Sequence, residues 1–353
     1  MNIQIEKLYK LLKNNVSHSE LRELCRTLLP SVLRDLPLNY SPSEMIHQIV
    51  ECSIRTGRVE QVHSWAQERF GKSNQTESEI EFLIITALEE EFDAVRRKFQ
   101  DVRQLDQSNG VYSAIVTSNQ RELNVILAYQ LFSGQSDAAA MTSTLCGRYK
   151  PRCVLLVGIA GGNQNNGVKL GDIIISNLIE DGGKGKVIGS GEVQLNWRSH
   201  TVDAGLLRAS RDLKNSENWQ KFISVKRPNS ISAIGFRTRI KNLFSSQQQE
   251  ICPSIVEGTT ISVPNVIKED NKIGGKWLKE FDTRNRNWLG VEMECGGAIT
   301  AISNYATEPK PKFLMIRSVT DFANSYKNDL WHPYACDVAA AYAYALIVNS
   351  CQS

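Results

Sequence analysis

The 353-residue sequence lacks several features that would place it in a large protein class. No apolar run approaches the roughly 18 residues of a membrane-spanning helix. The start, MNIQIEKLYKLLKNN, is amphipathic and charged, which is not the pattern of a secretory signal. The net charge of +3 is too small to favour nucleic acid as the main partner. We therefore expect a cytoplasmic protein that binds neither membranes nor nucleic acids.

The spacings typical of metal sites and disulfide frameworks are also missing. The eight cysteines form no Cys-x-x-Cys pair, and the five histidines are scattered singly. Cys25, Cys146 and Cys153 stand in apolar runs, which favours buried thiols in a reducing compartment. The sequence therefore predicts no metal, and it indicates no cofactor.

Two segments of different character are present, joined by a polar stretch. Residues 1–70 read as four helices, with apolar residues at helical spacing. Ser41, Pro42 and Glu44 have the pattern of a capping box with proline at the first helical position. Residues 71–80, GKSNQTESEI, read as a linker. We expect a small all-α helical bundle over 1–70 and a second domain over 81–353.

From residue 81 the pattern alternates between strands and helices. The expected strands lie at 81–87, 111–118, 122–129, 153–162, 171–176, 254–262 and 313–318. Helices are expected through Phe92 and Phe99, over 137–149 and over 334–348, and the stretch 182–200 is expected on loops. This alternation predicts a three-layer α/β domain with a mostly parallel or mixed central sheet.

Ligands of such domains bind beyond the carboxyl ends of the strands, and four segments place polar or glycine residues there. They are Ala87–Glu91, Val157–Gly162, Val291–Glu294 and Arg317–Asp321. Each has an ordinary structural explanation by itself, such as glutamates favouring the positive end of a helix dipole or glycines forming a turn. Their order and their strand context together favour a functional site.

These four segments resemble the purine nucleoside phosphorylase / methylthioadenosine nucleosidase family, over roughly residues 81–350. The motifs are Ala-x-Glu-Glu-Glu, Gly-x-Ala-Gly-Gly, Val-Glu-Met-Glu and Arg-x-x-x-Asp, followed by Trp-His-Pro-Tyr at 331–334. The resemblance implies a nucleoside phosphorylase-like fold. It also implies an enzyme that breaks the bond between a purine and its ribose.

The resemblance assigns roles to residues that match these motifs. Asp321 would be the general acid that protonates the purine at N7, and Glu91 the base that orients and deprotonates water. Glu294 would hold the ribose hydroxyls, Met293 would pack against the sugar, and Arg317 would fix the carboxylates. The remaining expected substrate contacts are Gly161, Val266 and Ile267. At 262–267 the sequence Ser-Val-Pro-Asn-Val-Ile departs from the family's Ser-Gly-Asp-x-Phe/Val-Ile, because the glycine and the aspartate are replaced.

The chemistry of the bond supports these roles independently. Cleavage builds positive charge on the ribose and negative charge on the departing base. A protonated carboxyl near N7 neutralises the leaving group, and a carboxylate near the water activates the nucleophile. A further carboxylate at the ribose stabilises the growing positive charge.

Water is favoured over phosphate as the nucleophile. Leu156 stands where the family's phosphorylases have an arginine, and Ile159 where they have a hydroxyl residue. Neither can hold a phosphate dianion, and Glu91 would repel one. Ile159 also differs from the serine of housekeeping nucleosidases.

The helical segment suggests regulation. Residues 53–59 and 66–70 resemble effector-associated, death-like helical adaptors, which recruit an effector through a partner that carries a similar domain. The alternative is a helical cap that only packs on the enzyme. The combination predicts an effector that depletes adenine nucleotides such as ATP or AMP. Basic residues that could meet a 5′-phosphate chain are Lys184, Lys186, Arg237, Arg239 and Lys268.

Two alternatives remain open at this point. One is a methylthioadenosine or adenosylhomocysteine nucleosidase with an added regulatory domain. The other is a catalytically idle sensor of purine nucleotides, against which the intact Glu91, Glu294 and Asp321 argue. By analogy with the family's nucleosidases we expect a homodimer or a higher oligomer.

Overall fold

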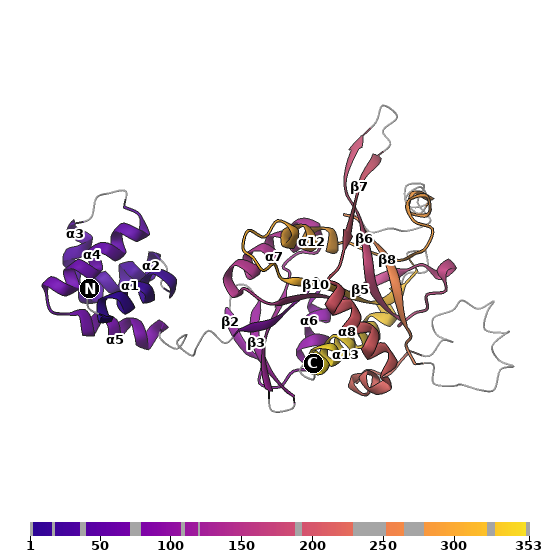
Figure 1. Ribbon diagram of the computed structural model, residues 1–353, viewed down its shortest axis with the longest axis horizontal. Helices are drawn as coiled ribbons and strands as arrows, with labels where there is room; N and C mark the ends of the chain where they lie inside the picture. Colours follow the sequence, from indigo (N-terminus) through magenta and orange to yellow (C-terminus); the bar gives the residue numbers. More distant parts are fainter. Residues whose placement is uncertain are drawn as a thin grey trace. The chain divides into compact units, whose positions relative to one another are not determined.

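The structure is a computed structural model, and Figure 1 shows its elements. It describes residues 3–15, 18–35, 40–70, 79–106, 110–118, 121–187, 193–228, 252–264, 279–322 and 329–350. The chain divides into two compact units, Met1–Ser78 and Glu79–Ser353. None of the helices in these ranges combines the length and apolarity that a membrane crossing requires.

The first unit is a bundle of short helices. They are α1 (Ile3–Asn15), α2 (His18–Leu28), α3 (Pro30–Asp35), α4 (Pro42–Arg55) and α5 (Val59–Phe70). Leucines and other apolar side chains from all five helices form one core. The capping box of α4 is confirmed, because the Glu44 amide donates to Ser41 Oγ and the Ser41 amide donates to the Glu44 carboxylate. The prediction of four helices missed α3, whose six residues are too few to show helical periodicity.

The second unit is a mixed α/β domain with a 10-stranded sheet in the described residues. Its strands are β1 (Ile80–Thr86), β2 (Arg103–Asp106), β3 (Val111–Ser118), β4 (Arg121–Tyr129), β5 (Cys153–Gly162), β6 (Ile173–Val187), β7 (Val193–Thr201), β8 (Ile255–Ser262), β9 (Trp288–Glu292) and β10 (Lys312–Asp321). The order is β10-β6-β8-β9-β5-β1-β4-β3-β2, with β7 paired to β6. Because β10 also pairs with β5, the five strands β5, β9, β8, β6 and β10 close into a ring.

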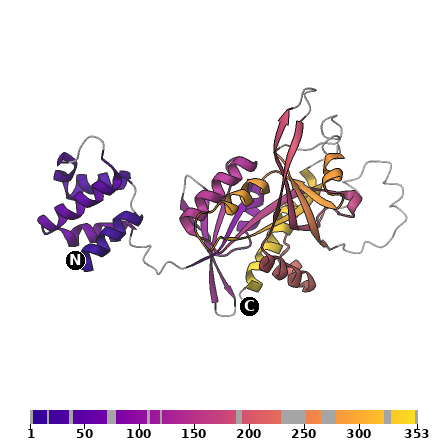
Figure 2. The same ribbon diagram turned by 45° about the horizontal axis from the view of Figure 1, so that its top comes forward.

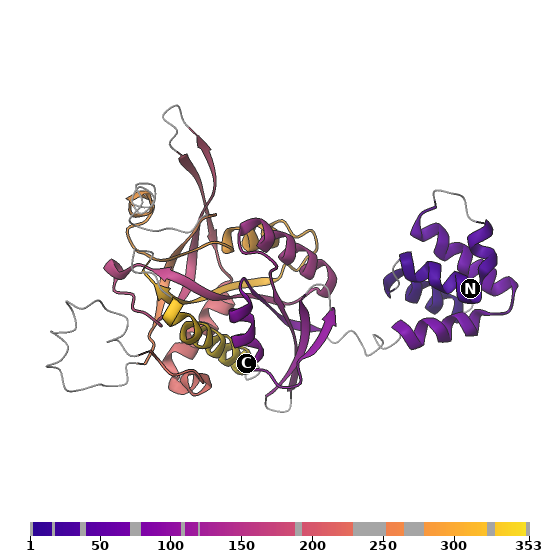
Figure 3. The same ribbon diagram turned by 180° about the vertical axis from the view of Figure 1, so that it is seen from behind.

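Helices cover both faces of this sheet, as the sequence predicts. The helices are α6 (Glu89–Arg96), α7 (Gln135–Tyr149), α8 (Ala204–Asn215), α12 (Cys295–Ser303) and α13 (His332–Ser350), with short 3₁₀ turns η2 (Gln164–Asn166), η3 (Glu217–Phe222) and η4 (Asp329–Trp331). Helices α6, α8 and α13 pack on one face, and α7 and α12 on the other (Figures 1 and 2). Seen from behind, α13 lies in front of the sheet (Figure 3).

Strands β1, β5 and β10 form the centre of the domain and point in the same direction. Their apolar side chains alternate between the two cores: Phe82 and Ile84 face one helix layer, and Leu83 and Ile85 face the other. Such a strand is buried on both faces, which explains its nearly continuous apolar sequence. The three parallel strands therefore bring their carboxyl ends to one edge of the sheet.

The expectation of loops over 182–200 is wrong for the residues that the structure describes there. Residues 182–187 form the end of β6 and residues 193–200 most of β7, two antiparallel strands that project from the sheet in Figures 1 and 2. The pairing register shifts between Asp181 and Lys184, where Gly182 and Gly183 stand. A Cβ on Gly182 would lie 2.9 Å from the Trp197 ring, so glycine permits the close approach of that ring. In the sequence, Gly182 and Gly183 resemble a turn. In the structure, they form a bulge within β6.

Candidate active site

The predicted site residues in the described part of the chain gather at the carboxyl edge of β1, β5 and β10. Glu91 lies in the first turn of α6, directly after β1. Asp321 ends β10 and pairs with Gly161 of β5, and Gly161 pairs in turn with Val291 of β9. The bend that follows β9 holds Met293 and Glu294. Val266 and Ile267 lie outside the residues that the structure describes.

Glu91 is almost completely buried and accepts three backbone hydrogen bonds. Its Oε2 accepts from the amides of Ala87 and Leu88 at 2.8 and 3.0 Å, and its Oε1 accepts from the amide of Ile159 at 2.8 Å. A carboxylate has about four acceptor positions, so one remains for a further donor such as water. The position of Glu91 is thus fixed by two strand ends together, β1 and β5.

Arg317 is the centre of the site's electrostatics. Its side chain is 0% exposed, and its guanidinium meets three carboxylates from different elements. Nη2 donates to Glu292 at 2.7 Å and to Glu294 at 2.9 Å. Nη1 lies 3.7 Å from Oε1 of Glu91. A planar cation with several donors suits this arrangement because one guanidinium can face carboxylates in different directions.

Glu292 received no role in the sequence analysis, although it stands within the Val-Glu-Met-Glu motif. Its carboxylate is buried and accepts from the amides of Glu294 and Cys295 as well as from Arg317. It therefore caps the start of α12 and holds the backbone of Glu294. Its place two residues before Glu294, at the end of a strand, is the signal that could have identified it.

Gly158 is the residue of β5 that faces Arg317 across the strand pair. A Cβ at this position would overlap with Nη1 of Arg317 and with the carboxylate of Glu91. Both groups are buried and held by other bonds, so neither can move away cheaply. The first glycine of the Gly-x-Ala-Gly-Gly motif therefore provides space for an ion pair.

Burial is the main cause of the shifted pKa values of the carboxyl groups around Arg317. Burial raises the pKa of Glu294 from 4.5 to about 7; Arg317 opposes this shift, while Glu292 and Glu91 add to it. Burial also raises the pKa of Glu91, against Arg317 and the three backbone donors. Burial alone would lower the pKa of Arg317, but the attraction of Glu292, Glu294 and Glu91 outweighs it and raises that pKa. The site thus keeps a permanent cation beside carboxyls that bind protons tightly.

Asp321 lies at the same sheet edge, as the last residue of β10. It is 7% exposed, and Thr320 Oγ1 donates to its Oδ2 at 3.1 Å. Met293 is half-buried and Gly161 lies in β5, so both flank the edge where Asp321 and Glu294 meet the strand ends. In the described ranges, no group of three His, Cys, Asp or Glu side chains is arranged to hold a metal ion.

A second polar network lies beside Glu294 and was not predicted. Gln135 Nε2, at the start of α7, donates to Asp181 at 2.9 Å and to Ser262 at 3.2 Å. Ser262 accepts from the amide of Gly296 in α12, and Asp181 accepts from the amide of Gly183. The network therefore fixes the start of α12 and the β6–β7 hairpin against each other. No spacing in the sequence predicts it, because its members come from four separate elements.

Lys184 and Lys186, the two lysines of β6 in the hairpin, follow Asp181 closely in the sequence. Lys184 directly follows Gly183, and both Lys184 and Lys186 are exposed. The other predicted cations, Arg237, Arg239 and Lys268, lie outside the described residues. Lys184 thus lies three residues beyond Asp181 in β6, and the Asp181 carboxylate lies against Gly296 in the first turn of α12.

Replacing Gly158 with alanine should destabilise the second unit, because the added methyl group has no space beside Glu91 and Arg317. Overpacking of this kind costs about 1–3 kcal/mol. The matched control is Gly147→Ala in α7, where a Cβ meets nothing within 4 Å and alanine favours the helix. Urea unfolding of the two variants measures the difference. Equal urea midpoints for Gly158→Ala and Gly147→Ala would contradict the prediction, because they would show that Glu91 and Arg317 can move to accommodate the methyl group at little cost.

Replacing Glu294 with glutamine should make stability less sensitive to pH. The folded protein holds the Glu294 proton more tightly than the unfolded chain does, since the folded pKa is raised to about 7. This contribution is fully present below about pH 4.5 and is lost as the pH rises through about 7. Relative to the parent, Glu294→Gln should gain about 2 kcal/mol between about pH 5 and about pH 8. Urea unfolding at several pH values measures the free energy of unfolding of both proteins. If it changed with pH equally in the parent and in Glu294→Gln, the raised pKa of Glu294 would be contradicted.

Two curated proteins are similar to part of this chain. ATP nucleosidase Cap17 of Escherichia coli (strain KTE188) is 26% identical over 268 residues, which are 73% of this chain and 49% of that protein. A death domain-containing ATP nucleosidase of Amphimedon queenslandica is 23% identical over 215 residues, 59% of this chain and 36% of that protein. The chain thus spans about half, or less, of the length of these curated relatives.

Solved structures share the fold of the second unit. The 5′-methylthioadenosine/S-adenosylhomocysteine nucleosidase of Neisseria meningitidis, in complex with methylthio-immucillin-A, has a TM-score of 0.53 at 17% identity and covers 76% of this chain and 98% of its own. The Streptococcus pneumoniae MTA/SAH nucleosidase with 8-aminoadenine has a TM-score of 0.55 at 15% identity, over 76% and 99%. At these identities the likeness concerns the fold. The profile of the Phosphorylase superfamily matches residues 81–347, and this chain therefore belongs to that superfamily.

Proposed function

We propose that the chain is a purine N-glycosidase that hydrolyses the base–ribose bond of adenine nucleotides or nucleosides. The observation that carries the proposal is the meeting of Glu91, Glu294 and Asp321 at one sheet edge, with Arg317 binding the first two. Each carboxyl has a different environment, so each suits a different step.

Asp321 acts as the general acid that protonates the purine at N7. Glu91 orients water through the acceptor position that its three backbone donors leave open, and takes its proton. Glu294 binds the ribose hydroxyls, and its negative charge opposes the positive charge that grows on the sugar. Met293 packs against the sugar. Arg317 and Glu292 act as positioning residues for Glu91 and Glu294.

The site's charge supports water rather than phosphate as the nucleophile. Ile159 presents an apolar side chain, and its amide is used by Glu91. Leu156 is fully buried in the core between the sheet and α7. A phosphate dianion would meet Glu91 without a compensating cation, because Arg317 is already surrounded by three carboxylates.

For the substrate we propose adenine nucleotides, with ATP as the leading candidate. The names of the two curated relatives above, both ATP nucleosidases, support this choice. Lys184 supports it too, since it follows the segment that the Asp181 network holds near Glu294. A 5′-phosphate chain needs such cations, whereas a 5′-thioether needs an apolar pocket.

The partner, the cellular location and the oligomeric state of the protein are also proposals. We propose that the helical unit recruits the enzyme to a partner with a similar domain, and that the whole acts as a nucleotide-depleting effector in the cytoplasm. The seven cysteines in the described residues are all free, which fits a reducing compartment.

We also propose a homodimer or a higher oligomer. Leu131 and Phe132 are 80% and 66% exposed at the β4–α7 connection, and such side chains suit an interface between copies of the chain.

Incubation with adenine nucleosides and nucleotides should release free adenine and a sugar with a free anomeric hydroxyl. Asp321→Asn keeps the shape of the side chain but cannot donate its proton, so turnover should fall by at least about 10²-fold. Chromatography of the products, with and without inorganic phosphate, provides the measurement. A sugar 1-phosphate would contradict hydrolysis. Adenine nucleotide binding without base release would favour the idle sensor.

Phosphorylated adenosines should be cleaved faster than methylthioadenosine. Lys184→Glu should raise the Michaelis constant for ATP about tenfold and leave that for adenosine nearly unchanged, because only ATP carries the 5′ charge. Lys214→Glu, on the exposed end of α8, is the control. A preference for methylthioadenosine would restore the methylthioadenosine/adenosylhomocysteine nucleosidase alternative.

A further inference from the structure

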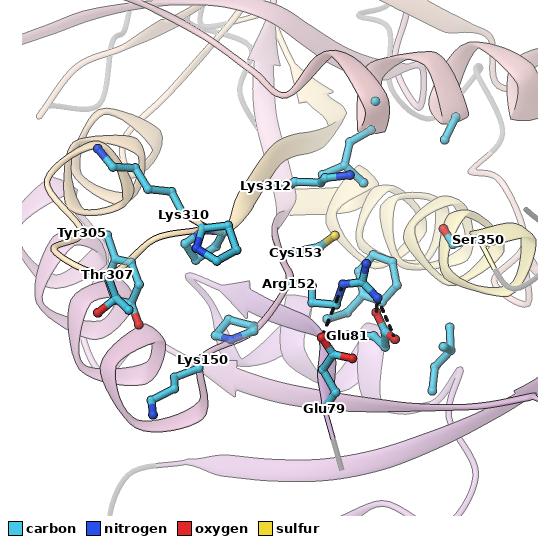
Figure 4. A pocket seen from close by; sticks show the side chains of 18 of the residues that line it. Glu79, Glu81, Lys150, Arg152, Cys153, Tyr305, Thr307, Lys310, Lys312 and Ser350 are labelled. Atoms are coloured by element: carbon cyan, nitrogen blue, oxygen red, sulfur yellow. Dashed lines mark hydrogen bonds and ion pairs between the residues drawn. The ribbon is translucent and has the colours of Figure 1, made fainter. Parts of the chain in front are cut away.

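A pocket lies at the opposite edge of the sheet from the candidate active site. It has a volume of about 680 Å³ and is lined by the first residues of β1, β5 and β10, the end of α7, the start of α8 and the segment 305–311. Figure 4 shows Lys150, Lys310 and Lys312 on different sides of the pocket, with Arg152 beside Glu79 and Glu81. The volume is within the range of pockets that hold small molecules, about 300–1,000 Å³.

The pocket is too far from the reacting carboxyls to belong to the same site. Strand β10 is 10 residues long, with Lys312 at its first position in this pocket and Asp321 at its last. At about 3.3 Å per residue the two ends are about 30 Å apart. A small molecule bound here cannot contact Asp321, so the pocket needs its own explanation.

The charges around the pocket favour an anion. Five lining residues are cationic (Arg121, Lys150, Arg152, Lys310 and Lys312) and three are acidic (Glu79, Glu81 and Glu308). Arg121 and Arg152 form ion pairs with Glu81 at 2.9 and 3.3 Å, and Lys310 Nζ donates to the carbonyl of Ser303. Lys150 and Lys312 are exposed and have no ion-pair or hydrogen-bond partner for their ammonium groups among the described residues. Two cations therefore remain for a ligand.

The walls between these cations are largely apolar. Phe82, Leu123, Pro151, Leu206 and Pro309 line the pocket, and the ring of Tyr305 stands beside them. The Tyr305 hydroxyl donates to the carbonyl of Cys146, which fixes the ring. A ligand that fills this volume therefore needs an uncharged body as well as negative charge.

We propose that this pocket is a second binding site, specific for a small phosphorylated molecule with an uncharged body. Lys150 and Lys312 bind the phosphate oxygens as point charges, and the apolar walls bind the rest of the ligand. The site does not depend on the identity of the substrate at the carboxyl edge.

Calorimetric titration of the full chain with inorganic tripolyphosphate tests the charged half of the site. The parent protein should bind it, with an affinity that falls as the salt concentration rises. Lys150→Glu and Lys312→Glu should each weaken binding at least about tenfold. Lys214→Glu lies outside the pocket and should bind like the parent.

Base release without tripolyphosphate should be unchanged in all three variants, which shows that they are folded and that the active site is intact. Unchanged tripolyphosphate binding in Lys150→Glu and Lys312→Glu would overturn the proposal, as would no binding by the parent. Equal weakening in Lys214→Glu would overturn it too, because it would show an effect of net charge alone.

Discussion

The contact between one buried guanidinium and three carboxylates is the interaction on which the rest of the site depends. Arg317 holds Glu91 from α6 and both Glu292 and Glu294 from the end of β9. Leaving any of these charges buried and unpaired would be costly, so the elements that carry them are held in register. In the proposed hydrolysis, this excess of negative charge suits a ribose that becomes positive and an uncharged nucleophile.

The topology of the sheet makes this contact possible. Strand β10 lies between β5 and β6, so Arg317 reaches the site from the most buried strand of the ring. The absence of a side chain at Gly158 lets Arg317 cross β5 to reach Glu91. The length of these parallel strands keeps the candidate active site and the pocket at the other sheet edge apart. Their carboxyl ends gather carboxyl groups, and their amino ends border a pocket whose Lys150 and Lys312 have no ion-pair partner among the residues that the structure describes.

Much of the fold follows from the sequence because its signals are local. Short apolar runs along 81–87, 153–162 and 313–318 predict the central strands, and Ser41 with Glu44 predicts a helix start. Short or atypical elements escape such reasoning. Helix α3 is only six residues long, and Gly182 with Gly183 resembles a turn although both lie in a strand. In these places tertiary contacts outweigh local preference.

For the site, the sequence determined which chemical groups stand at strand ends: Glu91, Glu294, Arg317 and Asp321, in an order typical of the Phosphorylase superfamily. Only the tertiary structure decided what each group meets. It gave Glu292 a capping role and assembled the network of Gln135, Asp181 and Ser262. It also set Lys150 and Lys312 around one pocket, although 161 positions separate them. The physical reason is that hydrogen-bonding partners in a mixed sheet are distant in sequence, and no periodicity records a contact between strands.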